Sequence, residues 1–289
     1  MEPNFFIVGA PKSATTNMSY YLKQHPQVFM PENLEPYYFA RLDIPENYQR
    51  EIISDKKKYL DLYKKATNHK AAGESSPVYL YCPHAAEDIR TQFPNSRIII
   101  SLRNPIEITD SQYYSLKFMK FNASRSFDEI LDVDEKQIER DEFHIDNLLI
   151  AGFYTKHIKR FQKIFPEDRI KIVIFEEYIK NTIPTINSIL KFLDINESTI
   201  FSEQPKGAFR EPRNSLTKNL LENSVFRKIV QKTIPTVPRQ KVGERLFVKE
   251  SQKPSMNKYQ RERLKKIFQQ DVKDLEGLLG RKLPWPDFN

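Results

Sequence analysis

The stretch FIVGAPKSATTNMSYYL, residues 6–22, decides how the chain begins to fold. An apolar run ends in Gly, Pro, Lys and Ser and gives way to a helical pattern, which predicts a strand, a tight turn and a helix N-terminus. Backbone N–H groups and the helix dipole favour an anion at such a terminus. Lys12 adds a full charge, and Ser13, Thr15 and Thr16 add hydroxyl donors. The stretch therefore predicts a phosphate site; a plain helix N-terminus capped by Ser13 or Thr15 is the alternative.

The position of the lysine differs from that in the nucleotide triphosphatase loop. That loop needs Gly-x4-Gly-Lys-Ser/Thr, whereas Lys12 follows Gly9 after only two residues. The apolar run 97–102 also ends in Arg103 rather than in an aspartate that would help to hold magnesium. We therefore expect the loop to bind phosphate without the equipment for a magnesium-bound triphosphate.

The composition is that of one large domain, or of one domain with a helical extension. Of the 289 residues, 39% are apolar, which is enough for a sizeable core. The single cysteine, Cys82, excludes an intrachain disulfide and a cysteine-based zinc site, as suits a reducing compartment. We see neither a run of about 18 apolar residues nor a signal peptide. A cytoplasmic, soluble protein without a membrane span is expected.

The net charge of +8 fits an anionic cofactor. It would also permit binding to nucleic acid or to a membrane surface. However, no recognised nucleic-acid-binding motif accompanies the charge, and the basic clusters alternate with acids and aromatics, as on solvated helix faces. We therefore expect no nucleic-acid partner, and no metal.

Four β-rich runs indicate a parallel sheet: FFIVG (5–9), KAAGE (70–74), RIIISL (97–102) and RIKIVIF (169–175). Continuous Ile and Val runs are typical of strands that helices cover on both faces. Helical patterns are found at 15–24, 83–93, 106–119, 151–164, 184–193 and 257–279. Strands separated by helices indicate βαβ units. Residues 205–255 are rich in proline and weakly periodic, so we expect a loop-rich lid or a helical insert there.

The stretch RIIISLRNPIEITDSQYY, 97–114, supplies a second candidate phosphate site. It ends a strand at Arg103 and then begins a helix that carries Ser111. Since neighbouring parallel strands end at the same edge of a sheet, where ligands bind, Arg103 should face the crevice of Lys12. An arginine fork and a serine hydroxyl suit a second phosphate. Alternatively, Arg103 forms a surface salt bridge at a strand end.

Together these features resemble the sulfotransferases that use 3′-phosphoadenosine 5′-phosphosulfate (PAPS). GAPKSATT is similar to their 5′-phosphosulfate loop, usually PKSGTT or PRSGTT, and SLRNPIEITDSQYY to their 3′-phosphate motif. LKQHPQVFMPENLEPYYFA resembles the HPxV…KEPxYF segment of the carbohydrate-type and bacterial branches, and GESSPVYLY their GExSPxYL strand end. The likeness spans most of the chain and leaves out only about residues 205–250. It implies a P-loop-like, three-layer α/β fold with a central parallel sheet flanked by helices, and a single sulfotransferase domain over 1–289.

The resemblance also implies roles for individual residues. Lys12 would bridge the 5′-phosphate and the sulfuryl oxygens and stabilise charge on the leaving phosphate. Glu35 would be the general base that deprotonates the acceptor. The residues that would bind the cofactor are Lys12, Ser13, Ala14, Thr15, Thr16, Arg103, Ser111 and Lys253. The last of these lies where related proteins place a loop that closes over the cofactor.

Two other acids compete with Glu35, which could itself be a surface acid in a loop. Glu32 would take its place if the alignment shifted by three residues. Glu74 ends a strand near the same crevice, where it could orient Lys12 or the acceptor, or simply be a strand-end acid. The aromatic residues Tyr37, Tyr38, Phe39, Tyr79 and Tyr81 could line the acceptor pocket, but a core position is the preferred interpretation.

Two residues depart from the family pattern. Ala14 replaces the usual glycine of PKSGTT, and alanine at a positive φ would cost about 1 kcal/mol. We therefore expect a negative φ there, or a loop that the methyl reshapes. Leu34 replaces the usual lysine before the glutamate, which favours a smaller or less acidic acceptor over a highly charged polysaccharide.

The leading hypothesis is thus a cytoplasmic, PAPS-dependent sulfotransferase without a required metal. The acceptor would be a hydroxyl, with an amine as second choice, on a saccharide or a small secondary metabolite. A P-loop kinase and a non-catalytic binder of adenosine phosphates or nucleic acid are the alternatives. The sequence leaves the oligomeric state open.

Overall fold

The computed structural model describes residues 1–44, 52–119, 125–198, 201–202, 210–212, 248–250 and 255–289. The predicted lid-like insert at 205–255 falls largely outside the described residues, and Lys253 falls outside them entirely. The chain divides into two compact units. The first comprises Met1–Tyr113, Arg125–Gln204 and Lys258–Asn289, and the second Tyr114–Ser124 and Pro205–Asn257.

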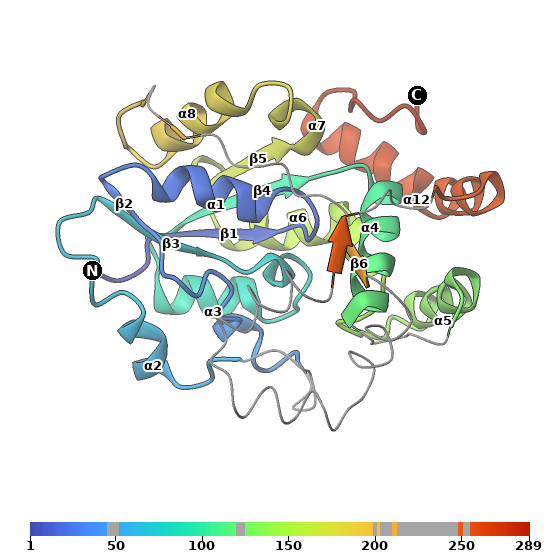
Figure 1. Ribbon diagram of the computed structural model, residues 1–289, viewed down its shortest axis with the longest axis horizontal. Helices are drawn as coiled ribbons and strands as arrows, with labels where there is room; N and C mark the ends of the chain where they lie inside the picture. The colour runs from blue at the N-terminus through green and yellow to red at the C-terminus, as the bar shows by residue number, and fades with distance from the viewer. Residues whose placement is uncertain (45–51, 120–124, 199–200, 203–209, 213–247, 251–254) are drawn as a thin grey trace. The chain divides into compact units, whose positions relative to one another are not determined.

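The first unit is built on the predicted parallel sheet (Figure 1). Its strand order is β2-β3-β1-β4-β5, and every neighbouring pair is parallel. The strands are β1 (Phe5–Gly9), β2 (Val28–Phe29), β3 (Ala71–Ser75), β4 (Arg97–Leu102) and β5 (Ile170–Ile174). The sheet confirms the α/β prediction, while the two-residue β2 is too short to give a sequence signal.

Six of the nine described α-helices lie where the periodicity predicts a helix, and the other three have no predicted counterpart. The α-helices are α1 (Thr15–Lys23), α2 (Lys56–Asp61), α3 (Ala85–Gln92), α4 (Pro105–Met119), α5 (Phe127–Glu139), α6 (Tyr154–Ile164), α7 (Phe175–Tyr178), α8 (Thr182–Phe192) and α12 (Lys258–Leu279). The 3-10 helices are η1 (Tyr38–Ala40), η2 (Pro77–Leu80), η3 (Ile150–Gly152) and η4 (Glu167–Arg169). In the second unit, β6 (Arg210–Pro212) pairs antiparallel with β7 (Val248–Glu250).

The alternation of side chains along β1 makes the three layers. Phe5 and Ile7 point to one face, where they join a buried cluster with α1 and α8. Phe6 points to the other face, where its ring lies 5.6 Å from that of Phe39 and 5.9 Å from that of Phe93, which follows α3. Since every residue of β1 is buried, the strand is covered on both sides, as its unbroken apolar run predicts.

The aromatic residues near the predicted crevice belong to the core. Tyr37, Tyr38, Phe39, Tyr79 and Tyr81 are all buried, which confirms the preferred interpretation. In the part of the chain that the structure describes, no helix is long and apolar enough to cross a lipid bilayer.

Candidate active site

The loop between β1 and α1 adopts a left-handed backbone at two residues that are not glycine. The φ angle is 60° at Lys12 and 64° at Ala14, so the expectation of a negative φ at Ala14 is wrong. A left-handed conformation costs an L-residue roughly 1–2 kcal/mol and persists only where surrounding contacts hold it. Here the Ala14 methyl packs against the buried cluster under α1, and this contact offsets part of the backbone cost.

The simple capped helix is not what the loop forms. Ala14 is the N-cap of α1, and among the described residues no side chain caps the helix. The hydroxyl of Ser13 instead donates to the carbonyl of Pro11 at 3.3 Å. Ser13 and Thr15 are buried, whereas Lys12 and Thr16 are exposed. The first turn contains no acidic residue, so the positive end of the helix dipole stays available to an anion.

Two hydrogen bonds join strand β4 to this loop. The buried hydroxyl of Ser101 donates to the carbonyl of Ser13 at 2.6 Å, and the backbone N–H of Ala10 donates to the carbonyl of Ser101 at 2.6 Å. Two neighbouring strand ends are thereby tied together at the edge where the candidate phosphate ligands lie.

Arg103 reaches across to the same loop. Its Nη1 donates to the carbonyl oxygen of Lys12 at 2.9 Å, and its guanidinium carbon lies 4.5 Å from the centre of the Phe175 ring. This partner is a backbone carbonyl rather than the carboxylate of a surface salt bridge. Arg103 and the lysine loop therefore share one edge of the sheet.

The backbone of Arg103 is held by a contact that the sequence did not reveal. The hydroxyl of Tyr154, the first residue of α6, donates to the carbonyl of Arg103 at 2.6 Å. The carboxylate of Asp271 on α12 accepts from the backbone N–H of Tyr154 at 2.8 Å and of Thr155 at 3.2 Å. Burial raises the pKa of Asp271 to about 6, although these hydrogen bonds lower it. A remote carboxylate thus replaces the local cap that α6 lacks.

The turn that leads into α4 is fixed by residues that are distant in sequence. Helix α4 itself carries Ser111, which is half-buried. Asn104 donates through Nδ2 to Asp287 at 2.7 Å and through its backbone N–H to Glu176 at 3.0 Å. The carboxylate of Asp287 also pairs with Arg261 at 2.6 Å. Although burial opposes it, the hydrogen bonds from Arg261 and Asn104 lower the pKa of Asp287. The position of α4 therefore depends on Glu176 and Asp287, which lie 72 and 183 positions from Asn104 in sequence and which no local pattern could predict.

The segment that carries Glu35 is pinned to the end of β3. The backbone N–H of Ser75 donates to the carbonyl of Leu34 at 2.9 Å, and Leu34 packs against the buried cluster. The Glu35 carboxylate accepts a hydrogen bond from the hydroxyl of Tyr37. Glu35 is half-buried, whereas Glu32 is exposed.

Glu74, at the end of β3, is fully buried among hydroxyl groups. Its carboxylate accepts from Tyr59 at 2.6 Å, from Ser76 at 2.6 Å and from Tyr79 at 3.1 Å. Burial raises the pKa of Glu74 to about 7; the three hydrogen bonds oppose this rise and the nearby charge of Glu35 adds to it. A carboxylate so enclosed is inaccessible to an acceptor, so Glu74 is not a plain strand-end acid and is poorly placed as a base.

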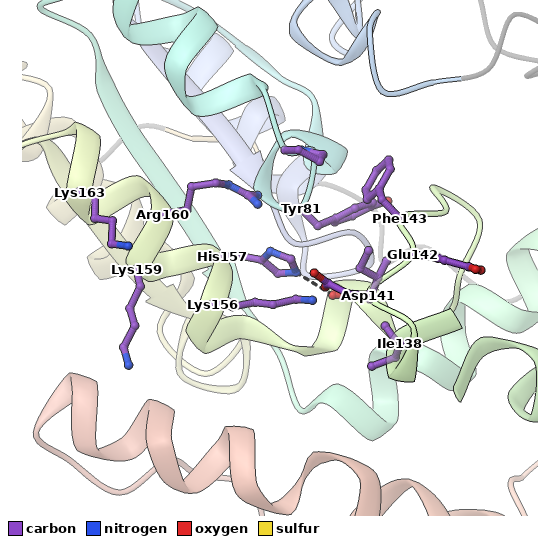
Figure 2. Close-up of a pocket in the computed structure, with 12 residues that line it drawn as sticks. Tyr81, Ile138, Asp141, Glu142, Phe143, Lys156, His157, Lys159, Arg160 and Lys163 are labelled. Atoms are coloured by element: carbon purple, nitrogen blue, oxygen red, sulfur yellow. Dashed lines mark hydrogen bonds between the residues drawn. The ribbon is translucent and has the colours of Figure 1, made fainter. Parts of the chain in front are cut away.

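The structure also contains a pocket of about 570 Å³ that none of the predicted catalytic or cofactor-binding residues line, although Tyr81, one of the aromatic residues considered for an acceptor pocket, does. Figure 2 shows its wall on α6, where Lys156, Lys159, Arg160 and Lys163 follow one another. His157, another lining residue, lies between Arg160 and Lys156, with its Nε2 at 2.9 Å from the carbonyl oxygen of Ile150. Burial lowers the pKa of His157 to about 3, so this histidine is a neutral, structural side chain.

Comparisons with known proteins show the family to which the chain belongs. Residues 2–276 match a family model described as the sulfotransferase domain. The membrane-associated sulfotransferase kil1 of Dictyostelium discoideum is 35% identical over 123 residues, which make up 42% of this chain and 25% of that protein. Heparan sulfate glucosamine 3-O-sulfotransferase 5 of Mus musculus is 26% identical over 195 residues, 67% of this chain and 54% of that protein. The chain thus spans a quarter of the first relative and about half of the second.

Two solved structures resemble the fold. A sulfotransferase from Alicyclobacillus acidocaldarius is 26% identical with a TM-score of 0.73, and 98% of each chain is covered. The mouse sulfotransferase SULT7A1, crystallised with PAP, is 13% identical with a TM-score of 0.51, covering 95% of this chain and 85% of that one. The second likeness concerns the fold alone.

Proposed function

Because the chain belongs to the sulfotransferase domain family, we propose that it transfers the sulfuryl group of PAPS to an acceptor hydroxyl, with an amine as second choice. The observation that carries this proposal is the junction of two strand ends, where Arg103 donates to the backbone of Lys12 at 2.9 Å. Two cations on one sheet edge suit a cofactor that bears phosphate at both its 5′ and 3′ positions.

The residues at this edge fit the anionic cofactor. The loop places the uncapped N-terminus of α1 beside the exposed Lys12. The 5′-phosphate would be held by Lys12 and by residues Ser13, Ala14, Thr15 and Thr16, and the 3′-phosphate by Arg103 and Ser111. Bound PAPS supplies an activated sulfuryl group on a phosphate leaving group. The task of Lys12 is to stabilise the negative charge that develops on that phosphate.

Glu35 is the best-placed general base among the three candidate acids. Its side chain is half-buried and oriented by Tyr37, whereas Glu74 is enclosed and Glu32 is exposed. The acceptor proton would pass to the Glu35 carboxylate as the acceptor oxygen attacks sulfur in line with the leaving phosphate. The Glu35→Gln variant should keep its affinity for PAP and lose roughly 100-fold or more in kcat. A variant with near-normal kcat would place the base elsewhere.

The acceptor is proposed to be a saccharide or a small secondary metabolite. The name of the mouse relative refers to heparan sulfate glucosamine, which favours a saccharide. Leu34, however, puts an apolar side chain packed on the core where the family pattern has a lysine, which favours an acceptor of low charge. The cytoplasmic location remains a prediction, and kil1 is by name a membrane-associated relative.

Radiolabelled PAPS with a panel of acceptors tests the reaction. The panel contains sulfated and unsulfated glycosaminoglycan oligosaccharides, simple glycosides and phenols. We expect label on an unsulfated saccharide or a phenol in the presence of EDTA. Magnesium-dependent transfer from ATP instead would identify a kinase. Tight binding of PAP without turnover of any acceptor would identify a non-catalytic binder.

A further inference from the structure

The hydroxyls that surround Glu74 also hold the segment that carries Glu35. Ser76 Oγ donates to Glu74 Oε2 at 2.6 Å and accepts the backbone N–H of Tyr37 at 3.3 Å. The Tyr79 hydroxyl donates to Glu74 at 3.1 Å and accepts the backbone N–H of Phe39 at 3.2 Å. Each hydroxyl therefore links the buried carboxylate to one amide of the same short segment.

The direction of these hydrogen bonds depends on the carboxylate. A hydroxyl has one proton, and its oxygen accepts where its lone pairs point. Because the proton of Ser76 and that of Tyr79 are both drawn to Glu74, the lone pairs of both oxygens face the amides of Tyr37 and Phe39. Without an acceptor at Glu74, either hydroxyl could rotate and release its amide.

We propose that Glu74 is a positioning residue: through Ser76 and Tyr79 it orients the segment 35–39 and thereby holds Glu35 in place for proton transfer. This inference rests on the proposed function in one respect, the role of Glu35 as the base. The positioning itself concerns only the backbone of the segment, so it can be measured without an acceptor.

The charge of Glu74 is part of this arrangement. The ionisable groups that face it are Tyr59 on α2, Tyr63 just after α2, Tyr79 on η2 and Glu35. Burial and the charge of Glu74 raise the pKa values of Tyr59 and Tyr79 well above the usual value of a tyrosine. Both hydroxyls therefore keep their protons and remain donors. Only the ionised carboxylate accepts from all its neighbours at once. Since its pKa is about 7, the segment should loosen as the pH falls through neutrality.

Amide hydrogen exchange of Tyr37 and Phe39, measured by NMR in the full chain with and without PAP, tests the proposal. In Glu74→Gln an NH2 group, which donates and does not accept, takes the place of Oε2, the oxygen to which Ser76 and Tyr79 both donate. We therefore expect both amides to exchange about tenfold faster at pH 8 than in wild type, because the two hydroxyls can turn away. The ratio of variant to wild-type rates should approach one at pH 5.5, where wild-type Glu74 is itself neutral. A ratio of one at pH 8, or one that does not change with pH, would overturn the proposal.

The matched control removes a different buried carboxylate. Asp134 on α5 is also buried, accepts the backbone N–H of Leu148 at 2.8 Å and has a pKa raised by burial to about 7. Asp134→Asn should leave the exchange of Tyr37 and Phe39 unchanged. If it accelerates them equally, the effect is general loss of stability and the proposal fails.

Two further variants keep the test valid if Glu74→Gln does not fold. Ser76→Ala should release the amide of Tyr37 while that of Phe39 stays protected, and Tyr79→Phe should do the reverse. If either variant accelerates the exchange of both amides equally, Ser76 does not hold the amide of Tyr37, and Tyr79 that of Phe39, independently of each other, and the proposal is contradicted.

Turnover then connects positioning with chemistry. With the acceptor found in the panel, Glu74→Gln should lower kcat about tenfold or more and change KM for the acceptor and the affinity for PAP less than twofold. Unchanged kcat together with faster exchange would overturn the catalytic part of the inference. Absence of turnover with every acceptor would count against the proposed function, while the exchange result would still decide the positioning.

Discussion

Ala14 shows how a single side chain can be accommodated in a conformation that normally favours glycine. Its φ of 64° places an L-residue in the left-handed region, which the sequence argument excluded because of its cost. The buried cluster contacts the Ala14 methyl, and a hydrogen bond from Ser101 fixes the neighbouring carbonyl of Ser13; neither contact can be read from the local sequence. The left-handed conformation at Ala14 therefore depends on tertiary contacts that no local pattern in the sequence contains.

The remaining cost at Ala14 is measurable. Glycine removes the left-handed penalty of roughly 1–2 kcal/mol but adds about 0.4–1 kcal/mol of unfolded-state entropy. We expect Ala14→Gly to raise the free energy of unfolding by about 0.5–1 kcal/mol, measured by urea denaturation. Ala86→Gly, within α3, is the control and should lower it by about 1 kcal/mol or more. Destabilisation by Ala14→Gly would mean that the methyl contact outweighs the backbone cost.

At the scale of elements, the β-rich runs predicted the strands well, whereas the short polar helices were not predicted. β1, β3, β4 and β5 lie within one residue of their predicted bounds, although only β1 and β3 are buried at every residue and β5 is half-buried over its first three. The short helices α2 and α7 were missed, although Asp55, the N-cap of α2, accepts the backbone N–H of Lys58 and is a local start signal. Phe175 begins α7 directly after β5, where the apolar pattern still indicates a strand.

The missed helix α5 did have a signal. Ser126 and Glu129 form a capping box, in which the Ser126 hydroxyl accepts the backbone N–H of Glu129 and the Glu129 carboxylate accepts that of Ser126. The spacing Ser-x-x-Glu before Ile130 and Leu131 would have predicted a helix start. By contrast, the contacts that assemble the candidate site, such as Tyr154 with Arg103, join distant segments and leave no local pattern.

The link between β4 and the lysine loop gives a prediction for these two elements. Ser101→Ala removes the buried hydrogen bond to the carbonyl of Ser13. We expect it to lower the free energy of unfolding by about 1–2 kcal/mol and to weaken PAP binding several-fold, because the loop loses a fixed point. Calorimetry with PAP and urea denaturation measure the two effects. The control is Ser96→Ala: the buried hydroxyl of Ser96 has no hydrogen-bond partner in the described part of the chain. Equal losses in the two variants would rule out a specific link.

At the scale of the whole molecule, buried acids make stability depend on pH. The pKa of Asp134 is raised from 3.8 to about 7, chiefly by burial. The folded state therefore binds this proton more tightly than the unfolded state. The resulting stability is fully present below the unfolded pKa and is lost as the pH rises through about 7.

Asp134→Asn tests that sign. Since asparagine has no charge to desolvate, the difference in unfolding free energy between variant and wild type should move in favour of the variant between pH 5 and pH 8. Chemical denaturation at both pH values measures it. The exposed Asp132, on the same helix, provides the control Asp132→Asn. A difference that moves the other way would show that Asp134 is stabilised in its ionised form.

The central claim is that the ends of β1 and β4 hold opposite ends of one bisphosphorylated nucleotide. Calorimetry of Lys12→Ala and Arg103→Ala with PAP and with adenosine 5′-monophosphate, which lacks the 3′-phosphate, tests it most directly. Each variant should lose about 1.5–3 kcal/mol of binding free energy for PAP. With the monophosphate, only Lys12→Ala should lose affinity. Unchanged PAP binding in both variants, or an equal loss for both nucleotides in Arg103→Ala, would contradict the claim.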